Sequence, residues 1–262
     1  MVPRVYDVAM FPYHDENVTL RPAYVTMAII GINVVAWLFV QGAGSADAVT
    51  ASVCNLGLVP AELMRSVPPG TAFPLGDGIA CIVDPGREPM HILTSMFLHG
   101  SWMHLLGNMW FLWLFGNNIE DSMTRPRFVA FYLACGVAAA LLQTFVTPDS
   151  IVPMVGASGA ISGVMGAYLI LYPRVRVFTL IPLGFFVTTM ALPAWAMLLY
   201  WAFLQLVSGL FTGVSGAQGG VAFWAHIGGF VAGLLLVGLF RRPDHVVAHR
   251  SSPWRPSQDR WI

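Results

Sequence analysis

Lysine is absent from this chain of 262 residues, and charged residues of all kinds make up only 10% of it. Soluble domains carry about 25% charged residues, so the composition excludes an ordinary soluble domain. The thirteen arginines are balanced by thirteen acidic residues, which leaves no net positive charge. A basic surface for nucleic acid is therefore excluded as the main function. Hydrophobic residues make up 56% of the chain and its mean hydropathy is +0.69, which indicates a membrane protein.

Cysteine is also scarce, with three residues in the whole chain. Cys135 falls in an apolar segment and is interpreted as a small packing residue. Cys54 and Cys81 fall in one long loop, where a disulfide would close a loop of about 27 residues. Two free thiols are the alternative, because the sequence does not give the Cα separation that decides between them.

Apolar stretches near the length of a membrane span occur six times. One helical span needs about 20 apolar residues. We therefore expect an all-α, polytopic bundle of six transmembrane helices over residues 23–240, between an N-terminal segment, 1–22, and a disordered tail, 241–262. A long loop, 41–91, joins the first two spans, and the first half of the apolar stretch 177–211 is expected to be an interfacial connection. The predicted spans are 23–40, 103–118, 128–146, 156–172, 193–211 and 221–240.

Arginines lie almost entirely on one side of this arrangement. If the N-terminus is cytoplasmic, eleven of the thirteen arginines fall in cytoplasmic segments, and only Arg65 and Arg87 fall outside. Cytoplasmic flanks of membrane spans are enriched in positive charge. The sequence thus predicts that both termini are cytoplasmic and that loop 41–91 is outside. The expected location is a bacterial plasma membrane.

Three polar residues occupy similar depths in three different predicted spans. Ser158, His226 and Asn108 lie about 15 to 17 residues from the nearest cytoplasmic arginine, which places them roughly 23 to 26 Å above the inner boundary. Polar and ionisable side chains inside a bilayer are costly and mark functional sites. Small residues repeat every four positions in 156–166 and 225–233, which lets two helix backbones approach closely. We expect Ser158 and His226 to meet; the alternative is that the glycines serve packing alone and the serine bonds to its own helix.

A serine beside a histidine can act as a nucleophile. Its hydroxyl is weakly nucleophilic until a base takes the proton, and neutral imidazole is the usual base near neutral pH. No acidic residue is found at a matching depth, so we expect a dyad of Ser158 and His226. Attack on an amide carbonyl produces an oxyanion that needs donors already in place. The Ser158 backbone N–H at a helix start, with His104 and Asn108 four residues apart on one helical face, can supply them; the alternatives are an interfacial role for His104 and helix capping by Asn108.

Three motifs in this order resemble those of the rhomboid family of intramembrane serine proteases. They are the segment 97–108 with its His and Asn, the sequence Gly156-Ala157-Ser158-Gly159, and the segment 225–230 that begins Ala225-His226. The resemblance covers roughly residues 20–241. It implies that Ser158 is the nucleophile, that His226 is the general base, and that His104, Asn108 and the Ser158 amide form the oxyanion hole. It also implies cleavage of transmembrane segments of other membrane proteins, without a metal or nucleotide.

Other functions fit parts of the sequence. A rhomboid-like pseudoenzyme would bind transmembrane helices without cleaving them, but it would ordinarily lack the serine or the histidine. A small membrane transporter is expected to show internal repeats, and none is found.

The sequence departs from the rhomboid pattern in one place. The rhomboid family often has a Trp-Arg pair in its first outer loop, whereas segment 41–91 contains no tryptophan.

Partners and cofactors follow from the same residues. No cysteine or carboxylate completes a zinc ligand set with His99, His104 and His226, so we expect no metal and no cofactor. The expected partners are transmembrane protein substrates and membrane lipid, with no nucleic acid, and the sequence leaves the oligomeric state open. We expect a substrate helix to enter past the fifth span, which has bulky side chains at Trp195, Trp201, Phe203 and Phe211. We expect Trp201 and Phe203 to form the gate, so smaller residues there should change turnover of a membrane substrate.

Overall fold

Helices occupy all six segments that the sequence predicts as spans. The computed structural model describes residues 11–76, 79–84, 86, 89–183, 186–215 and 221–251. The first two segments each continue from an α-helix into a π-helical stretch. The helices are α1 (Tyr24–Val35) with η1 (Ala36–Val40), α5 (Trp102–Phe111) with η4 (Leu112–Gly116) and α6 (Asn117–Asp121), α7 (Arg125–Val146), α8 (Ser158–Leu171), α9 (Ala194–Ser215) and α10 (Phe223–Phe240).

Three of these helices are long and apolar enough to cross a membrane, judged by length and composition. They are α7, the part of α9 over Ala194–Thr212, and α10. The helices over Tyr24–Val40 and Ser158–Leu171 are apolar but shorter. With 14 residues, α8 extends about 21 Å, less than a hydrocarbon core of about 30 Å. A helix of this length that starts at one boundary ends inside the membrane.

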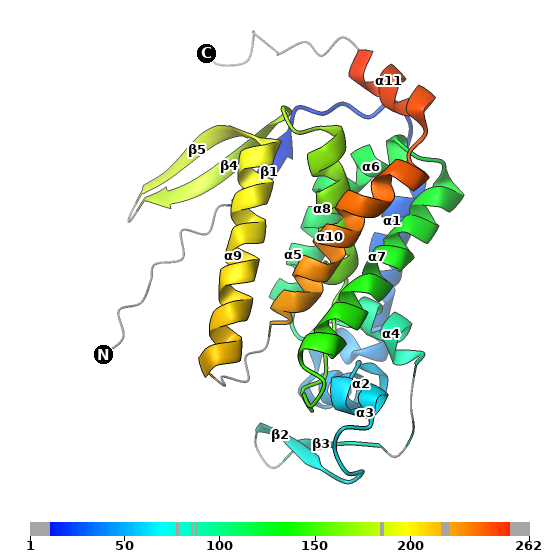
Figure 1. Cartoon of the computed structure of the whole chain (residues 1–262), viewed down its shortest axis with the longest axis vertical. Coiled ribbons are helices and arrows are strands. Elements are labelled where there is room, and N and C mark those ends of the chain that lie inside the picture. The colour runs from blue at the N-terminus through cyan, green and yellow to red at the C-terminus, as the bar shows by residue number, and fades with distance from the viewer. Residues whose placement is uncertain are drawn as a thin grey trace.

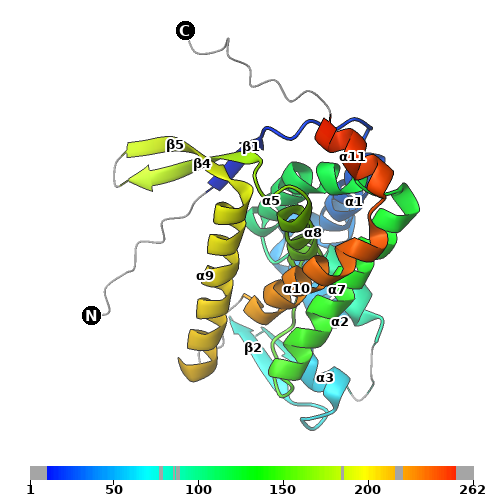
Figure 2. The ribbon, with the colours of Figure 1, turned by 45° about the horizontal axis from the view of Figure 1, so that its top comes forward.

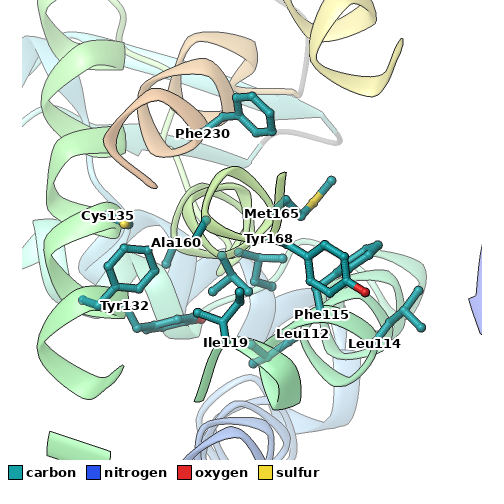
Figure 3. Packing of buried hydrophobic residues seen from close by; sticks show 14 of the residues in the cluster. Leu112, Leu114, Phe115, Ile119, Tyr132, Cys135, Ala160, Met165, Tyr168 and Phe230 are labelled. Atoms are coloured by element: carbon teal, nitrogen blue, oxygen red, sulfur yellow. The ribbon is translucent and has the colours of Figure 1, made fainter. Parts of the chain in front are cut away.

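Helix α8 lies at the centre of the buried core. Figure 3 shows Ala160 and Met165 of α8 between Tyr132 and Cys135 of α7 on one side and Phe230 of α10 on the other. All five side chains are buried within one hydrophobic cluster. Since α8 packs against α7, α10 and the η4 region, its position decides where its first residue, Ser158, lies.

The contact between α8 and α10 depends on glycine. A Cβ atom at Gly229 would overlap the carbonyl group of Gly159, and one at Gly233 would overlap that of Gly163. Backbones in such contact leave no room for any larger side chain. The close approach predicted from the small-residue repeats is thus confirmed.

The chain is mostly helical, as expected, but strands form two small sheets, so the fold is not purely α-helical. One sheet is antiparallel in the order β1-β4-β5, and the other pairs β2 with β3. In β4, Val177, Thr179 and Ile181 are buried and alternate with partly exposed residues. This alternation with a period of two is typical of strands and was masked by the overall apolarity of 177–192. The strands are β1 (Phe11–Asp15), β2 (Ala72–Gly76), β3 (Ile79–Ile82), β4 (Arg176–Leu183) and β5 (Phe186–Pro193).

The C-terminal segment is not wholly disordered, contrary to the expectation for 241–262. Helix α11 covers Pro243–Ser251, while 252–262 lies outside the described residues. His249 of α11 is 5% exposed, and its Nδ1 lies 2.6 Å from the Tyr172 hydroxyl. This buried contact fixes α11 against the end of α8.

The two ends of the molecule differ in structure. Figures 1 and 2 place the sheet β1-β4-β5 and α11 at one end, and α2 (Ala46–Leu56), α3 (Pro60–Met64) and the β2-β3 hairpin at the opposite end. At that second end Cys54 and Cys81 form a disulfide with a Cα–Cα distance of 5.2 Å. The bridge that the sequence left open is therefore present. It joins α2 to β3 within the predicted outer loop.

Candidate active site

Ser158 and His226 meet at the boundary between α8 and α10. Ser158 is the first residue of α8, and His226 lies in the first turn of α10. The Ser158 Oγ is 2.7 Å from the His226 Nε2, which is within hydrogen-bond range. The contact expected from their common depth is present, and in it the imidazole can accept the hydroxyl proton.

A third side chain, from α9, completes this contact. The Gln205 Oε1 lies 2.7 Å from the His226 Nδ1. An amide oxygen only accepts hydrogen bonds, so Nδ1 carries the proton. In a neutral ring Nε2 then has a free lone pair directed at Ser158. Gln205 was not predicted from the sequence, because an acidic residue was expected in this role, although a glutamine inside an apolar span was itself a signal.

An aromatic side chain of α9 also packs against the histidine. The Trp201 ring centroid lies 5.9 Å from that of His226 and 6.0 Å from that of Phe230. Phe203 is 59% exposed and does not line the cleft around Ser158, whereas Trp201 does. The two residues expected to form a gate therefore occupy different faces of α9.

His104 and Asn108 lie one turn apart on α5 and line the same cleft as Ser158. The His104 Nδ1 accepts a hydrogen bond of 3.4 Å from the Gly100 N–H. This bond leaves the proton of a neutral ring on Nε2, so that nitrogen can donate. Asn108 is 7% exposed, and its amide nitrogen has no partner among the described residues. Two donors are thus free to meet a developing negative charge.

The segment before Ser158 keeps His104 beside the serine. Gly156 has a φ of +131°, a backbone angle that residues with a side chain rarely adopt. A Cβ at this position would also lie 2.9 Å from the His104 ring. The Gly156 N–H donates to the Ser95 carbonyl at 2.8 Å. Glycine is therefore needed in the motif around Ser158 for both conformation and space.

A cleft of about 1160 Å³ opens above these residues. Ser158, His226, His104, Asn108, Gln143 and Trp201 all contribute to its lining. Gln143 of α7 accepts a hydrogen bond of 3.1 Å from the Ala225 N–H, which fixes the start of α10 next to His226. The first turn of α8 leaves backbone N–H groups without acceptors in the helix, among them that of Ser158. Ser158, His226 and the hydrogen-bond donors His104 and Asn108 therefore face one space large enough for an extended peptide segment.

His99 takes no part in this group. It is completely buried and its ring packs edge-on against that of His104, with 5.1 Å between centroids. Among the residues that the structure describes, no group of three His, Cys, Asp or Glu side chains is placed to hold a metal ion. The chemistry of the cleft is that of a hydroxyl, two imidazoles and amide groups.

Comparisons with known proteins relate this chain to one family. The model of the Rhomboid domain family matches residues 86–243. This segment contains His104, Asn108, Ser158, Gln205 and His226. Rhomboid protein 1, mitochondrial, of Saccharomyces cerevisiae is 29% identical over 55% of this chain and 40% of its own length. Rhomboid-like protease 5 of Toxoplasma gondii is 31% identical over 56% of this chain and 16% of its own length. Rhomboid-like protein 11, chloroplastic, of Arabidopsis thaliana is 29% identical over 57% of this chain and 52% of its own length. The chain thus spans about half or less of the length of these relatives.

Proposed function

We propose that this chain, which belongs to the rhomboid family of integral membrane proteins, is an intramembrane serine endopeptidase that cleaves transmembrane segments of other proteins. The observation that carries the proposal is the 2.7 Å contact between Ser158 Oγ and His226 Nε2. The contact lies in a cleft lined by two further donors, His104 and Asn108. A serine that only packs in a helix interface would need neither the contact with His226 nor the two donors.

The proposed reaction begins with transfer of the Ser158 proton to His226 Nε2. The Oγ attacks the substrate carbonyl carbon, and the negative charge that forms on its oxygen is met by the Ser158 N–H, His104 and Asn108. The C–N bond then breaks, and the leaving amine takes the proton from His226. Water attacks the acyl-enzyme with His226 again acting as base, which releases the acid and restores Ser158.

The proposed arrangement in the membrane has six spans over residues 23–240, with segments 1–22 and 241–262 on the cytoplasmic side. The short length of α8 supports it, because Ser158 then lies inside the membrane at the base of a cleft that water can reach. The disulfide supports an outer location for loop 41–91, since disulfides persist on the oxidising side. The names of two relatives refer to mitochondrion and chloroplast, so they give no support to the bacterial plasma membrane expected from the sequence.

Co-expression with a membrane protein that has a single span tests the proposal. We expect cleavage within or next to that span by the parent chain, and none by Ser158→Ala or His226→Ala. Ser208→Ala, a serine variant on α9, serves as the matched control and is expected to cleave. Cleavage by Ser158→Ala would refute the proposal. Co-purification of the intact substrate with the parent chain, without cleavage, would instead identify a pseudoenzyme.

A further inference from the structure

The first turns of α9 are held by buried side chains and backbone hydrogen bonds. Its first residues, Ala194 and Leu198, are completely buried. The Ala194 N–H donates to the Val175 carbonyl at 2.8 Å, and the Trp195 N–H donates to that of Pro173 at 2.9 Å. Large apolar side chains further along the helix are exposed, namely Leu199, Phe203, Leu204, Leu206, Leu210 and Phe211.

The less buried half of α9 nevertheless holds the histidine of the cleft. Gln205 accepts from His226 Nδ1 at 2.7 Å, and Trp201 covers the ring at a centroid distance of 5.9 Å. Figures 1 and 2 show α9 at the edge of the bundle, beside α10. Trp201 and Gln205 are four residues apart and so lie on one face of α9. Both contacts to His226 therefore come from one face of α9, and Gly209 of the same helix packs against Phe223 and Trp224 of α10.

We propose that Gln205 is a positioning residue of the site: it holds His226 as the Nδ1–H tautomer, so that Nε2 is free to take the Ser158 proton only while α9 lies against α10. This inference rests on the proposed function and adds to it a third side chain and a condition for activity.

The chemistry explains why an amide is sufficient for this role. A neutral imidazole has two tautomers, and only the Nδ1–H form offers a lone pair to Ser158. A positioned acceptor at Nδ1 selects that form and also stabilises the imidazolium that exists during catalysis. Loss of a hydrogen bond to a group that becomes charged corresponds to about a tenfold to hundredfold loss of rate.

Variants at Gln205 separate positioning from packing. Gln205→Leu keeps the approximate volume and removes the acceptor, while Gln205→Glu keeps the acceptor. We expect Gln205→Leu to lower kcat about tenfold to hundredfold on a membrane substrate in proteoliposomes, with KM little changed. Gln205→Glu is expected to retain most of kcat. Leu206→Ala, which removes an exposed side chain of the same helix, is the matched control and is expected to match the parent.

A small fluorophosphonate probe measures the reactivity of Ser158 without the need for a substrate helix to enter. The rate of labelling is expected to fall in Gln205→Leu by the same factor as kcat, and to recover in Gln205→Glu. Equal kcat and labelling in Gln205→Leu and the parent would overturn the inference. A parent chain that neither cleaves nor labels at Ser158 would instead refute the proposed function.

Nitrogen-15 NMR of chain labelled at histidine gives a readout that is independent of activity. The His226 signals are identified by their loss in His226→Ala. We expect a protonated Nδ1 and an unprotonated Nε2 in the parent, and a mixture of tautomers in Gln205→Leu. A protonated Nε2 in the parent would contradict the proposal even if the enzyme is active.

Discussion

Single residues of the cleft have hydrogen-bonding capacity that the folded chain does not use. The Asn108 amide nitrogen is buried without a partner among the described residues, and the His104 Nε2 faces the cleft next to Gly156. A buried donor without an acceptor costs free energy, so such groups are uncommon unless a ligand or a transition state engages them. In the proposed reaction both donors meet the oxyanion that forms when Ser158 attacks a carbonyl group.

Removal of either donor should therefore lower the rate of catalysis more than substrate binding. We expect His104→Ala and Asn108→Ala each to lower kcat by about 10²- to 10³-fold with a small change in KM. The measurement is steady-state cleavage of a membrane substrate in detergent or proteoliposomes. His91→Ala, which changes a histidine that does not line the cleft, is the control. An unchanged kcat in both cleft variants would remove these residues from the proposed oxyanion hole.

At the end of the molecule that holds the sheet β1-β4-β5, the buried carboxyl group of Asp15 links β1 to the helices. Asp15 Oδ2 accepts hydrogen bonds from the Tyr168 hydroxyl at 2.5 Å and from Asn118 Nδ2 at 3.0 Å. Burial raises the pKa of Asp15 from 3.8 to about 7, although the bond from Tyr168 opposes this shift. The folded chain therefore keeps this proton at pH values where the unfolded chain has lost it.

This pKa difference predicts how stability depends on pH. Below about pH 4 Asp15 is protonated in both states, and between about 4 and 7 only the folded chain holds the proton, so stability falls as pH rises through this window. The effect amounts to at most about 4 kcal/mol. Asp15→Asn should flatten that part of the pH profile and raise the Tm at pH 8. Thermal unfolding of both proteins from pH 4 to 8 tests this, and identical profiles would count against it.

Among the elements, the α8–α10 pair determines the geometry of the site. Ser158 belongs to one helix and His226 to the other, and glycines keep the two backbones in contact. A shift of either helix by about the width of a methyl group would take the two side chains out of hydrogen-bond range. Packing and chemistry thus depend on the same interface.

Two glycines of α10 allow a matched test of this interface. A side chain at Gly233 would overlap the Gly163 carbonyl, whereas at Gly238 a Cβ would meet nothing within 4 Å. We expect Gly233→Val to cost about 1 to 3 kcal/mol of stability or more and to abolish cleavage. Gly238→Val should behave like the parent. Tm and activity measured on both variants decide the point, and equal effects would show that the close approach is not required.

For the whole molecule, the disulfide joins two parts of segment 41–91 that are far apart in sequence. Cys54 and Cys81 are 27 residues apart, and Glu62 of α3 also accepts from the Asp84 N–H at 3.0 Å. The bond restricts the unfolded chain and is worth about 2 to 4 kcal/mol in typical cases. It stabilises the end of the molecule where the predicted outer loop covers the bundle.

Reduction of this bond should be visible as a loss of stability. We expect the Tm of the parent to fall when a reductant is added, and Cys54→Ser/Cys81→Ser to have the lower Tm with or without it. Cys135→Ala retains the disulfide and should respond to the reductant like the parent. A double variant as stable as the oxidised parent would show that the bond contributes nothing to the folded state.

How much the sequence predicted differs between parts of the chain. Apolar stretches located the helices in the six segments predicted as spans, and glycine repeats located the α8–α10 contact, because both depend on local spacing; the shorter helices α2, α3 and α11 were not predicted. The strand β4 was missed since its alternation lies within a continuously apolar segment. The burial of His249 was missed because it depends on Tyr172, a residue 77 positions away.

The sequence by itself determined the membrane class of the protein, its family and the identity of the polar residues at a common depth, because hydropathy, arginine distribution and short motifs are properties of the linear chain. Only the tertiary structure decided that Gln205 from α9 bonds to His226, that Cys54 and Cys81 are bridged and that Asp15 is buried. These features depend on distances between segments that are remote along the chain. Such distances are set by how all the helices pack together and not by any one of them.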